Sequence, residues 1–405
     1  MVSRLSSFLF STHLSRHSGF RWYSSKRVVA LTGIQPTGTP HLGNYLGMIR
    51  PCIDLQNSGK ISTLLILIAD LHALTSNVAV PTGSLELASA LVACFSNHVN
   101  PNVNCSTALF LQSSVYGHSE LMWILANCCT LPRLSHLPQW REKSGLADLK
   151  QRSELLDVPL PPDSPSNFAD SLEVSSSVGL FTYPILQAAD VLLYDAELVP
   201  VGSDQTTHIE LTRDLARSAV ARWPRLADLL HPPTALTLGV SKINSLRNPC
   251  KKMSKSDPST EGTIYITDSP DVVRRKVKRA VTDSLPGISY DTEQRPGVSN
   301  LLRILAAIER RELDDVVSEA SHWDKTTLKS RVTDALVHHF APLRSRIQTL
   351  MGTPNGIEEV RKQFLQGSVL ANHLAAERLR AIKSAIGLGL DVSSDVSDCT
   401  SRLNL

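Results

Sequence analysis

The sequence predicts an α/β fold in which a doubly wound parallel sheet is followed by a mostly α-helical domain. Segments with helical spacing near residues 44–57 and 84–99 separate three short aliphatic runs, at residues 28–31, 62–69 and 107–111. Such alternation is typical of parallel strands joined by helices. The ligand crevice is then expected beyond the carboxyl ends of the strands. After Ser256 helical patterns dominate to about residue 387, beginning where Ser269 caps a helix that Pro270 opens.

Shifts in composition predict four parts of the chain. Residues 1–27 hold five Lys and Arg, many serines and no acid, which is typical of a mitochondrial transit peptide, with a disordered basic tail as the alternative. Residues 28–258 form the Rossmann-type sheet domain, which a Pro/Ser-rich insertion interrupts at about 157–177. Residues 259–388 form the helical domain, and residues 389–405 form a Ser/Asp-rich flexible tail.

Composition and charge exclude several classes of protein. Of the 405 residues 42% are hydrophobic, enough for a sizeable core, but the longest apolar run, residues 64–69, is too short for a membrane helix. Seven cysteines without a C-x-x-C pair predict reduced thiols and no metal site. Outside the first 27 residues 36 Lys and Arg stand against 38 acids. Any RNA surface must therefore be a local strip, for which helix residues Arg274, Arg275, Lys276, Lys278 and Arg279 are candidates.

The most informative stretch is Lys251-Lys252-Met253-Ser254-Lys255-Ser256. Lysines three residues apart in a short, Ser-rich loop can follow a polyphosphate as it is expelled, because mobile cations stabilise the charge that builds on its oxygens. A solvated lysine patch is the alternative interpretation. The segment makes nucleotide chemistry the first hypothesis.

A second motif lies directly after the first aliphatic run. Gly33-Ile34-Gln35-Pro36 leads into His41-Leu42-Gly43-Asn44, which places backbone amides, an imidazole and a helix N-terminus where phosphates can bind. Gly43 is expected to let adenine and phosphates approach the backbone. Taken alone, the second half of this motif is also an ordinary helix start.

Together the two motifs resemble the signature pair of class I aminoacyl-tRNA synthetases. Residues 179–213, GLFTYPILQAADVLLYDAELVPVGSDQTTHIELTR, are similar to tryptophanyl-tRNA synthetases, mitochondrial type, over nearly their whole length. The resemblance implies that the catalytic residues are Lys252, Lys255, His41 and Gln35. It also implies an ATP-binding set comprising Gln35, His41, Gly43, Asn44, Gly202, Asp204, Gln205, Arg141, Lys143, Lys252, Met253, Ser254, Lys255 and Ser256.

The same resemblance implies the tryptophan-binding residues. It assigns Asp190 to the indole N–H and Tyr183 to the wall of the side-chain pocket, with Gln187, His72 and Gln205 also near the amino acid. A physical argument supports the first assignment independently: indole has a single donor, so a buried carboxylate acceptor fixes its orientation. Phenylalanine is then rejected, because the carboxylate would be left buried and unpaired.

The sequence therefore predicts ATP-dependent ligation of L-tryptophan to mitochondrial tRNA(Trp) through a tryptophanyl-adenylate, in the mitochondrial matrix, with Mg²⁺ bound to the phosphates. The resemblance further implies a homodimer. One alternative is a tyrosyl-tRNA synthetase, which Gln187 favours because tyrosyl enzymes use a glutamine and an aspartate near the substrate hydroxyl. Another is a non-catalytic RNA-binding or splicing protein that kept the synthetase fold. Intact His41, Lys252 and Lys255 weigh against the latter.

Overall fold

The computed structural model describes residues 28–75, 80–96, 102–137, 177–202, 205–237, 243–255 and 260–389. The predicted transit peptide at 1–27, nearly all of the predicted insertion at 157–177 and the tail from residue 390 lie outside the described residues. Within the described ranges, no helix combines the length and the hydrophobicity that crossing a membrane requires.

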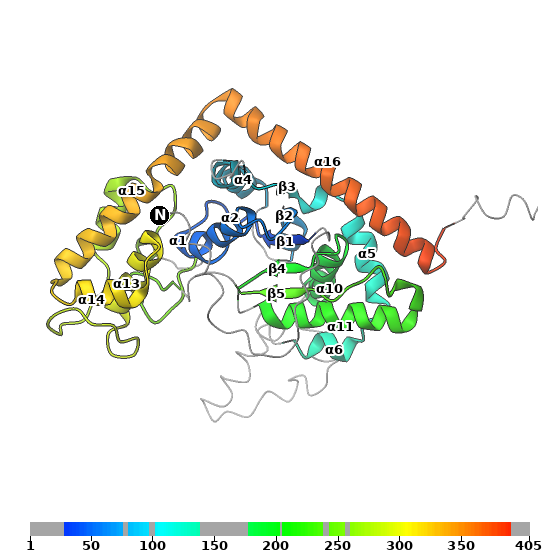
Figure 1. Cartoon of the computed structure of the whole chain (residues 1–405), viewed down its shortest axis with the longest axis horizontal. Helices are drawn as coiled ribbons and strands as arrows, with labels where there is room; N and C mark the ends of the chain where they lie inside the picture. The colour runs from blue at the N-terminus through cyan, green and yellow to red at the C-terminus, as the bar shows by residue number, and fades with distance from the viewer. Residues whose placement is uncertain are drawn as a thin grey trace, which may run out of the picture.

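A five-stranded parallel sheet forms the centre of the molecule (Figure 1). Its strands lie in the order β3-β2-β1-β4-β5, with the bounds Ser106–Leu111, Thr63–Ile68, Val29–Ile34, Leu198–Pro200 and Thr234–Leu236. The first three strands along the chain confirm the predicted aliphatic runs. All six residues of β2 are buried, because helices cover both faces of the sheet, and this burial explains why β2 reads as a continuous apolar run.

Strand order determines where a ligand can bind. The chain winds outward from β1 through β2 to β3 and then returns to place β4 on the other side of β1. The connections after β1 and β4 therefore leave the same edge of the sheet in opposite directions. A parallel sheet binds ligands at this switch point. The motif that ends in His41-Leu42-Gly43-Asn44 follows β1, and Gly202 follows β4.

Two hydrophobic cores cover the two faces of the sheet. Alternate residues of β2 divide between them: Leu64, Ile66 and Ile68 face one core, and Leu65 and Leu67 face the other.

The helices and helical turns up to residue 262 are α1 (Leu42–Asn44), the π-helical η2 (Tyr45–Ile49), α2 (Arg50–Gln56), α3 (Asp70–Ala73), α4 (Val80–Ser96), η3 (Gln112–Ser114), α5 (Gly117–Ala126), α6 (Leu131–Ser135), α10 (Val178–Leu192), α11 (Thr206–Arg222), η5 (Pro224–Leu226) and η6 (Thr260–Gly262).

Helices make up most of the remaining chain. They are α12 (Pro270–Lys278), α13 (Pro296–Glu309), α14 (Leu313–Ala320), α15 (Lys325–Gly352) and α16 (Pro354–Ala385). The predicted start of α12 is confirmed: the hydroxyl of Ser269 accepts from the backbone N–H of Val272, and Pro270 occupies the first helical position.

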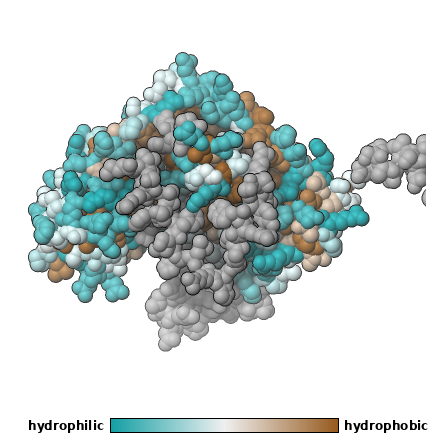
Figure 2. All heavy atoms as spheres, viewed as in Figure 1, coloured by the Kyte–Doolittle hydropathy of each residue, from teal (hydrophilic) through white to brown (hydrophobic). Residues whose placement is uncertain are grey.

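The last helix does not stay within the helical region. Figure 1 shows α15 and α16 meeting at an apex, from which α16 runs back over the sheet. A Cβ on Gly367 would lie 2.0 Å from the carbonyl oxygen of Leu109 in β3, so the helix contacts the backbone of the edge strand directly. In Figure 2 hydrophobic residues emerge along α16, where Leu365 and Val369 are exposed.

Candidate active site

The structure brings the two sequence motifs together. The Lys255 ammonium donates to the carbonyl oxygen of Gly38 at 2.9 Å and to the carbonyl and hydroxyl oxygens of Thr37 at 3.2 and 3.1 Å. The chain beyond the lysine loop then runs beside the start of α1, where Leu42 N–H donates to Ile264 O at 2.8 Å. Segments more than 200 residues apart in sequence thus form one site at the carboxyl end of β1.

His41 is held by a reciprocal cap at the start of α1. Its Nδ1 accepts from the backbone N–H of Asn44 at 3.3 Å, and the Asn44 side-chain oxygen accepts from the backbone N–H of His41 at 3.2 Å. Burial, together with the positive charges of Lys255 and Lys252, lowers the pKa of His41 to about 4. The imidazole is therefore neutral at neutral pH, and its proton lies on Nε2, which can donate to a phosphate oxygen.

Gly43 has a structural role that the sequence did not reveal. The sequence suggested that it lets a nucleotide approach the backbone. In the structure a Cβ at Gly43 would lie 2.9 Å from Cε1 and 3.0 Å from Nδ1 of His41, closer than real Cβ contacts. The absent side chain therefore makes room for the His41 ring.

Gly43→Ala is expected to weaken ATP use about tenfold, the effect of losing one well-placed hydrogen bond to a charged group. The added methyl group would push the imidazole off its cap on Asn44. Gly47→Ala is the matched control, because nothing lies within 4 Å of a Cβ there. Steady-state KM for ATP in pyrophosphate exchange measures both variants. Similar values for the two would show that the His41 ring tolerates the methyl group.

The lysine loop is anchored by Met253, which is buried and whose N–H donates to Ile243 O at 2.9 Å. Lys252 is exposed on one side of this anchor. On the other side burial lowers the pKa of Lys255 to about 8, an effect that the negative charge of Glu86 partly opposes. Glu86 also accepts from the backbone and hydroxyl of Thr39, at 3.3 and 3.0 Å, and so holds the loop that receives Lys255.

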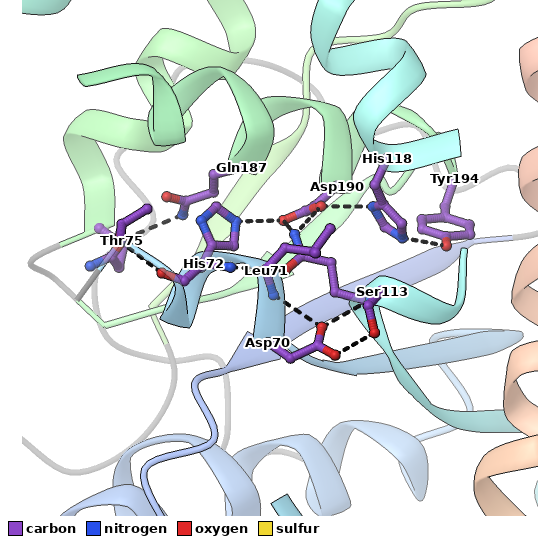
Figure 3. A network of polar contacts seen from close by, with 11 residues as sticks. Asp70, Leu71, His72, Thr75, Ser113, His118, Gln187, Asp190 and Tyr194 are labelled. Carbon is purple, nitrogen blue, oxygen red and sulfur yellow. Dashed lines mark hydrogen bonds and ion pairs between the residues drawn. The ribbon is translucent and has the colours of Figure 1, made fainter. Parts of the chain in front are cut away.

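A second cluster of polar side chains surrounds Asp190, a residue of α10 that is only 4% exposed (Figure 3). His72 Nε2 of α3 lies 2.9 Å from Oδ2, and Gln112 Nε2 of η3 donates to Oδ1 and Oδ2 at 2.8 and 2.9 Å. His118 Nδ1 of α5 lies 2.7 Å from Oδ1. Its Nε2 lies 2.9 Å from the hydroxyl oxygen of Tyr194.

The donors around Asp190 keep this buried carboxyl ionised. Burial alone would raise its pKa, but the contacts with His118 and His72 outweigh burial and hold the pKa well below its usual range. Sequence reasoning identified Asp190 and His72 but missed Gln112, His118 and Tyr194. One signal was present, because Gln112 directly follows β3 and so stands at the same edge of the sheet as His72.

Other predicted substrate residues lie on the same helix as Asp190. Tyr183 is one heptad before it, with its ring edge-on to His72 at 6.2 Å between centroids and its hydroxyl 3.0 Å from His208 Nε2. The amide of Gln187 donates to the side-chain oxygen of Gln205 at 3.3 Å. Gln205 stands at the N-cap of α11, so these side chains connect α10 to the loop after β4.

Comparison with known proteins identifies the family. Residues 23–341 match the family described as tRNA synthetases class I (W and Y). The chain belongs to this synthetase family. The mitochondrial tryptophan–tRNA ligase of Schizosaccharomyces pombe is 34% identical over 370 residues, which cover 89% of this chain and 95% of that protein.

Solved structures of related synthetases superpose on nearly the whole molecule. Tryptophanyl-tRNA synthetase of Mycoplasma pneumoniae has a TM-score of 0.70 and 29% identity, covering 90% of this chain and 99% of that chain. The Campylobacter jejuni enzyme, complexed with ADP and tryptophan, has a TM-score of 0.65 and 27% identity, covering 89% and 100%. The Rossmann-type sheet and helical region predicted for this synthetase are confirmed.

In the described part of the chain, several predicted site residues of the synthetase make no side-chain contact with the Lys255–His41 site or with the cluster around Asp190. Gln35 is exposed and contributes its backbone carbonyl, which accepts from Thr37 N–H at 2.8 Å. Gly202 is exposed after β4. Ser254 contributes its backbone carbonyl, which accepts from the Thr263 hydroxyl at 3.0 Å. Four further ATP-site predictions lie outside the described residues, namely Asp204, Ser256, Arg141 and Lys143.

The expected basic strip of the synthetase needs one correction. Lys276 is buried to 3% exposure, and its ammonium donates to Asp268 at 2.7 Å and to Thr263 O at 2.8 Å. It therefore fastens α12 to the loop before it and cannot meet RNA phosphates. Arg275 and Arg279 are exposed but both pair with Glu261 at 3.2 Å. Sequence spacing marked a basic helix but did not reveal which lysine faces inward.

Proposed function

We propose that this synthetase activates L-tryptophan with ATP and transfers it to tRNA(Trp) in the mitochondrial matrix. The observation that carries the proposal is the buried Asp190 carboxylate, which the contacts with His72, Gln112 and His118 hold ionised. Similarity to a mitochondrial tryptophan–tRNA ligase supports both the amino acid and the organelle. The basic, acid-free composition of residues 1–27 supports the matrix location.

The chemistry requires no nucleophile from the protein. The tryptophan carboxylate attacks the α-phosphate of ATP, the bond to the bridging oxygen breaks, and pyrophosphate leaves. The terminal ribose 2′-hydroxyl of the tRNA then attacks the acyl carbon and releases AMP. Lys252 and Lys255 would stabilise the charge that develops on the leaving pyrophosphate, and His41 would donate to a phosphate oxygen.

Magnesium would enter with the nucleotide. Within the described ranges no cluster of three His, Cys, Asp or Glu side chains is placed to hold a metal ion. Because Mg²⁺ keeps several waters and binds readily to substrate phosphates, the ATP phosphates themselves can carry it. It would then neutralise phosphate charge beside the two lysines.

Asp190 can accept the indole N–H with little rearrangement. The amide nitrogen of Gln112 lies within hydrogen-bond distance of both carboxylate oxygens, so it can keep Oδ1 and release a lone pair of Oδ2. Oδ2 is on the side of His72 and Tyr183. We propose that Tyr183 and Gln187 contact the tryptophan, with Gln205 and Asp204 near the amino acid and the ATP ribose.

Pyrophosphate exchange with each of the twenty amino acids separates the candidate functions. Exchange that depends on tryptophan is expected. Dependence on tyrosine would instead support the tyrosyl enzyme, for which the Gln187–Gln205 pair is the favouring feature. Failure of every amino acid, in a protein that still binds tRNA, would support the non-catalytic RNA-binding alternative.

A homodimer is proposed through the outer face of α5. Tyr116 and Trp123 lie two helical turns apart and are 85% and 72% exposed. Large aromatic side chains are enriched at protein–protein contacts, so this exposed pair is a candidate contact site. Wild-type protein is expected to have a dimeric mass in light scattering at micromolar concentration, and Trp123→Glu is expected to halve it. Leu365→Glu, a similarly exposed apolar position on α16, is the control that should leave the dimer intact. A monomeric wild type would reject this proposal.

A further inference from the structure

We propose that Tyr194 and His118 form a positioning pair that fixes the orientation of the Asp190 carboxylate and so selects an amino acid whose ring carries an N–H donor. This inference rests on the proposed function. It adds two residues, absent from the predicted site, that act through Asp190 without touching the substrate themselves. Figure 3 shows the three side chains in line, with His118 between the tyrosine hydroxyl and the carboxylate.

The neighbours of His118 fix the orientation of its imidazole ring. Its side chain is fully buried, and its Nε2 lies 2.9 Å from the Tyr194 hydroxyl. Phe110 stacks on the imidazole at 6.3 Å between centroids and meets the Tyr194 ring edge-on at 5.9 Å. Among the described residues Nδ1 makes no hydrogen bond of standard geometry, so its close contact with Oδ1 of Asp190, at 2.7 Å, is what offsets its burial.

The order of donors along this line follows from the tyrosine. Burial, together with the negative charge of Asp190, raises the pKa of Tyr194 far above its usual value, so the hydroxyl keeps its proton and can donate it to Nε2 of His118. An imidazole that accepts at Nε2 carries its proton on Nδ1. The N–H at Nδ1 then lies beside Oδ1 of Asp190, which is 2.7 Å from the nitrogen. Tyr194 thereby selects the tautomer that attracts the carboxylate.

The same arrangement gives the two carboxylate oxygens of Asp190 different tasks: Oδ1 contacts His118, and Oδ2 faces the proposed amino-acid site. Oδ1 is held from the closed interior by His118, whose side chain has no exposure. Oδ2 is on the side of His72, whose side chain is 10% exposed and meets the Tyr183 ring. If Nδ1 lost its proton to Nε2, a lone pair would face Oδ1 and repel it, and the carboxylate would turn. Oδ2 would then no longer be aimed at an indole N–H.

Tyr194→Phe tests the pair with minimal change in volume. The readout is kcat/KM in pyrophosphate exchange for L-tryptophan relative to 3-benzothienyl-L-alanine, in which sulfur replaces the ring N–H. The variant is expected to lower this ratio about 5- to 10-fold, as one lost hydrogen bond would, by raising KM for tryptophan alone. Tyr45→Phe is the matched control, because it removes another hydroxyl–imidazole contact, the partly buried 2.9 Å bond to His339, and should leave the ratio unchanged.

A second pair of variants separates positioning from packing. The side-chain nitrogen of His118→Asn can replace the Nδ1 donor, whereas His118→Leu offers none, so the asparagine variant should retain more of the ratio. Equal losses toward both amino acids in Tyr194→Phe would overturn the inference, as would a wild type that does not favour tryptophan over its analogue. Should His118→Leu not fold, Tyr194→Phe decides alone. If the wild-type protein shows no tryptophan-dependent pyrophosphate exchange, the proposed function is rejected instead.

Discussion

Lys255→Ala is expected to slow formation of the adenylate about 10²- to 10³-fold, the loss typical of removing one preorganised group that stabilises transition-state charge. The Lys255 ammonium reaches the loop between β1 and α1 and is partly buried there, so water cannot replace it easily. Tryptophan binding should change little, because the lysine acts on charge that develops only as pyrophosphate leaves. Single-turnover activation and calorimetric tryptophan binding measure the two effects separately.

The pH dependence of this lysine gives a second measurement. Burial lowers the pKa of Lys255 to about 8, so the ammonium is charged below that pH and loses its proton above it. The kcat/KM for ATP, which reports the free enzyme, should therefore fall as pH rises through about 8. Lys255→Arg keeps the charge and should abolish the fall. The pKa of about 4 for His41 lies outside this window, so that histidine should not contribute.

Lys251→Ala is the matched control for the lysine loop, since this neighbouring lysine is exposed and outside the proposed phosphate contacts. It should activate tryptophan at nearly the wild-type rate. Lys252→Ala should slow activation as Lys255→Ala does. If neither Lys252→Ala nor Lys255→Ala alters single-turnover activation, the loop does not hold pyrophosphate and the catalytic assignment fails.

Asp190→Asn is expected to weaken tryptophan binding about 10- to 100-fold and to leave ATP binding largely intact. The amide would present an N–H₂ group to His72 or Gln112, which donate to the carboxylate, or to His118 Nδ1, which lies 2.7 Å from it, and it removes the acceptor proposed for indole. A buried polar group left unpaired costs about 1–3 kcal/mol, which sets the range. Isothermal titration of tryptophan, with and without an ATP analogue, measures it.

Asp70→Asn is the control for this substitution. Asp70 belongs to the same network in Figure 3, but its carboxylate accepts from the backbone of Leu71 and Ser113 at 3.0 and 2.9 Å, and an amide oxygen can replace it there. Its effect on tryptophan affinity should be about threefold at most, as expected for one net hydrogen bond. Unchanged affinity in Asp190→Asn would remove Asp190 from the amino-acid site.

Sequence patterns of short range determined most of the secondary structure that carries this site. Aliphatic runs predicted β1, β2 and β3, because strands buried on both faces are continuously apolar. A capping serine before a proline predicted the start of α12. The strands β4 and β5 have only three residues each, which is too short for any periodicity to stand out. The two motifs could be recognised because each is contiguous in the chain.

Only the tertiary structure decided which buried polar groups meet. Asp190 is paired with His72, which is 118 residues away in sequence, and with Gln112 and His118, which come from two further elements. Local sequence likewise could not tell that Lys276 points inward, or that Gly43 makes room for the imidazole of His41. Periodicity records how each element alternates between core and solvent. Contacts between buried polar side chains depend on how the elements pack against one another, and no local pattern encodes that packing.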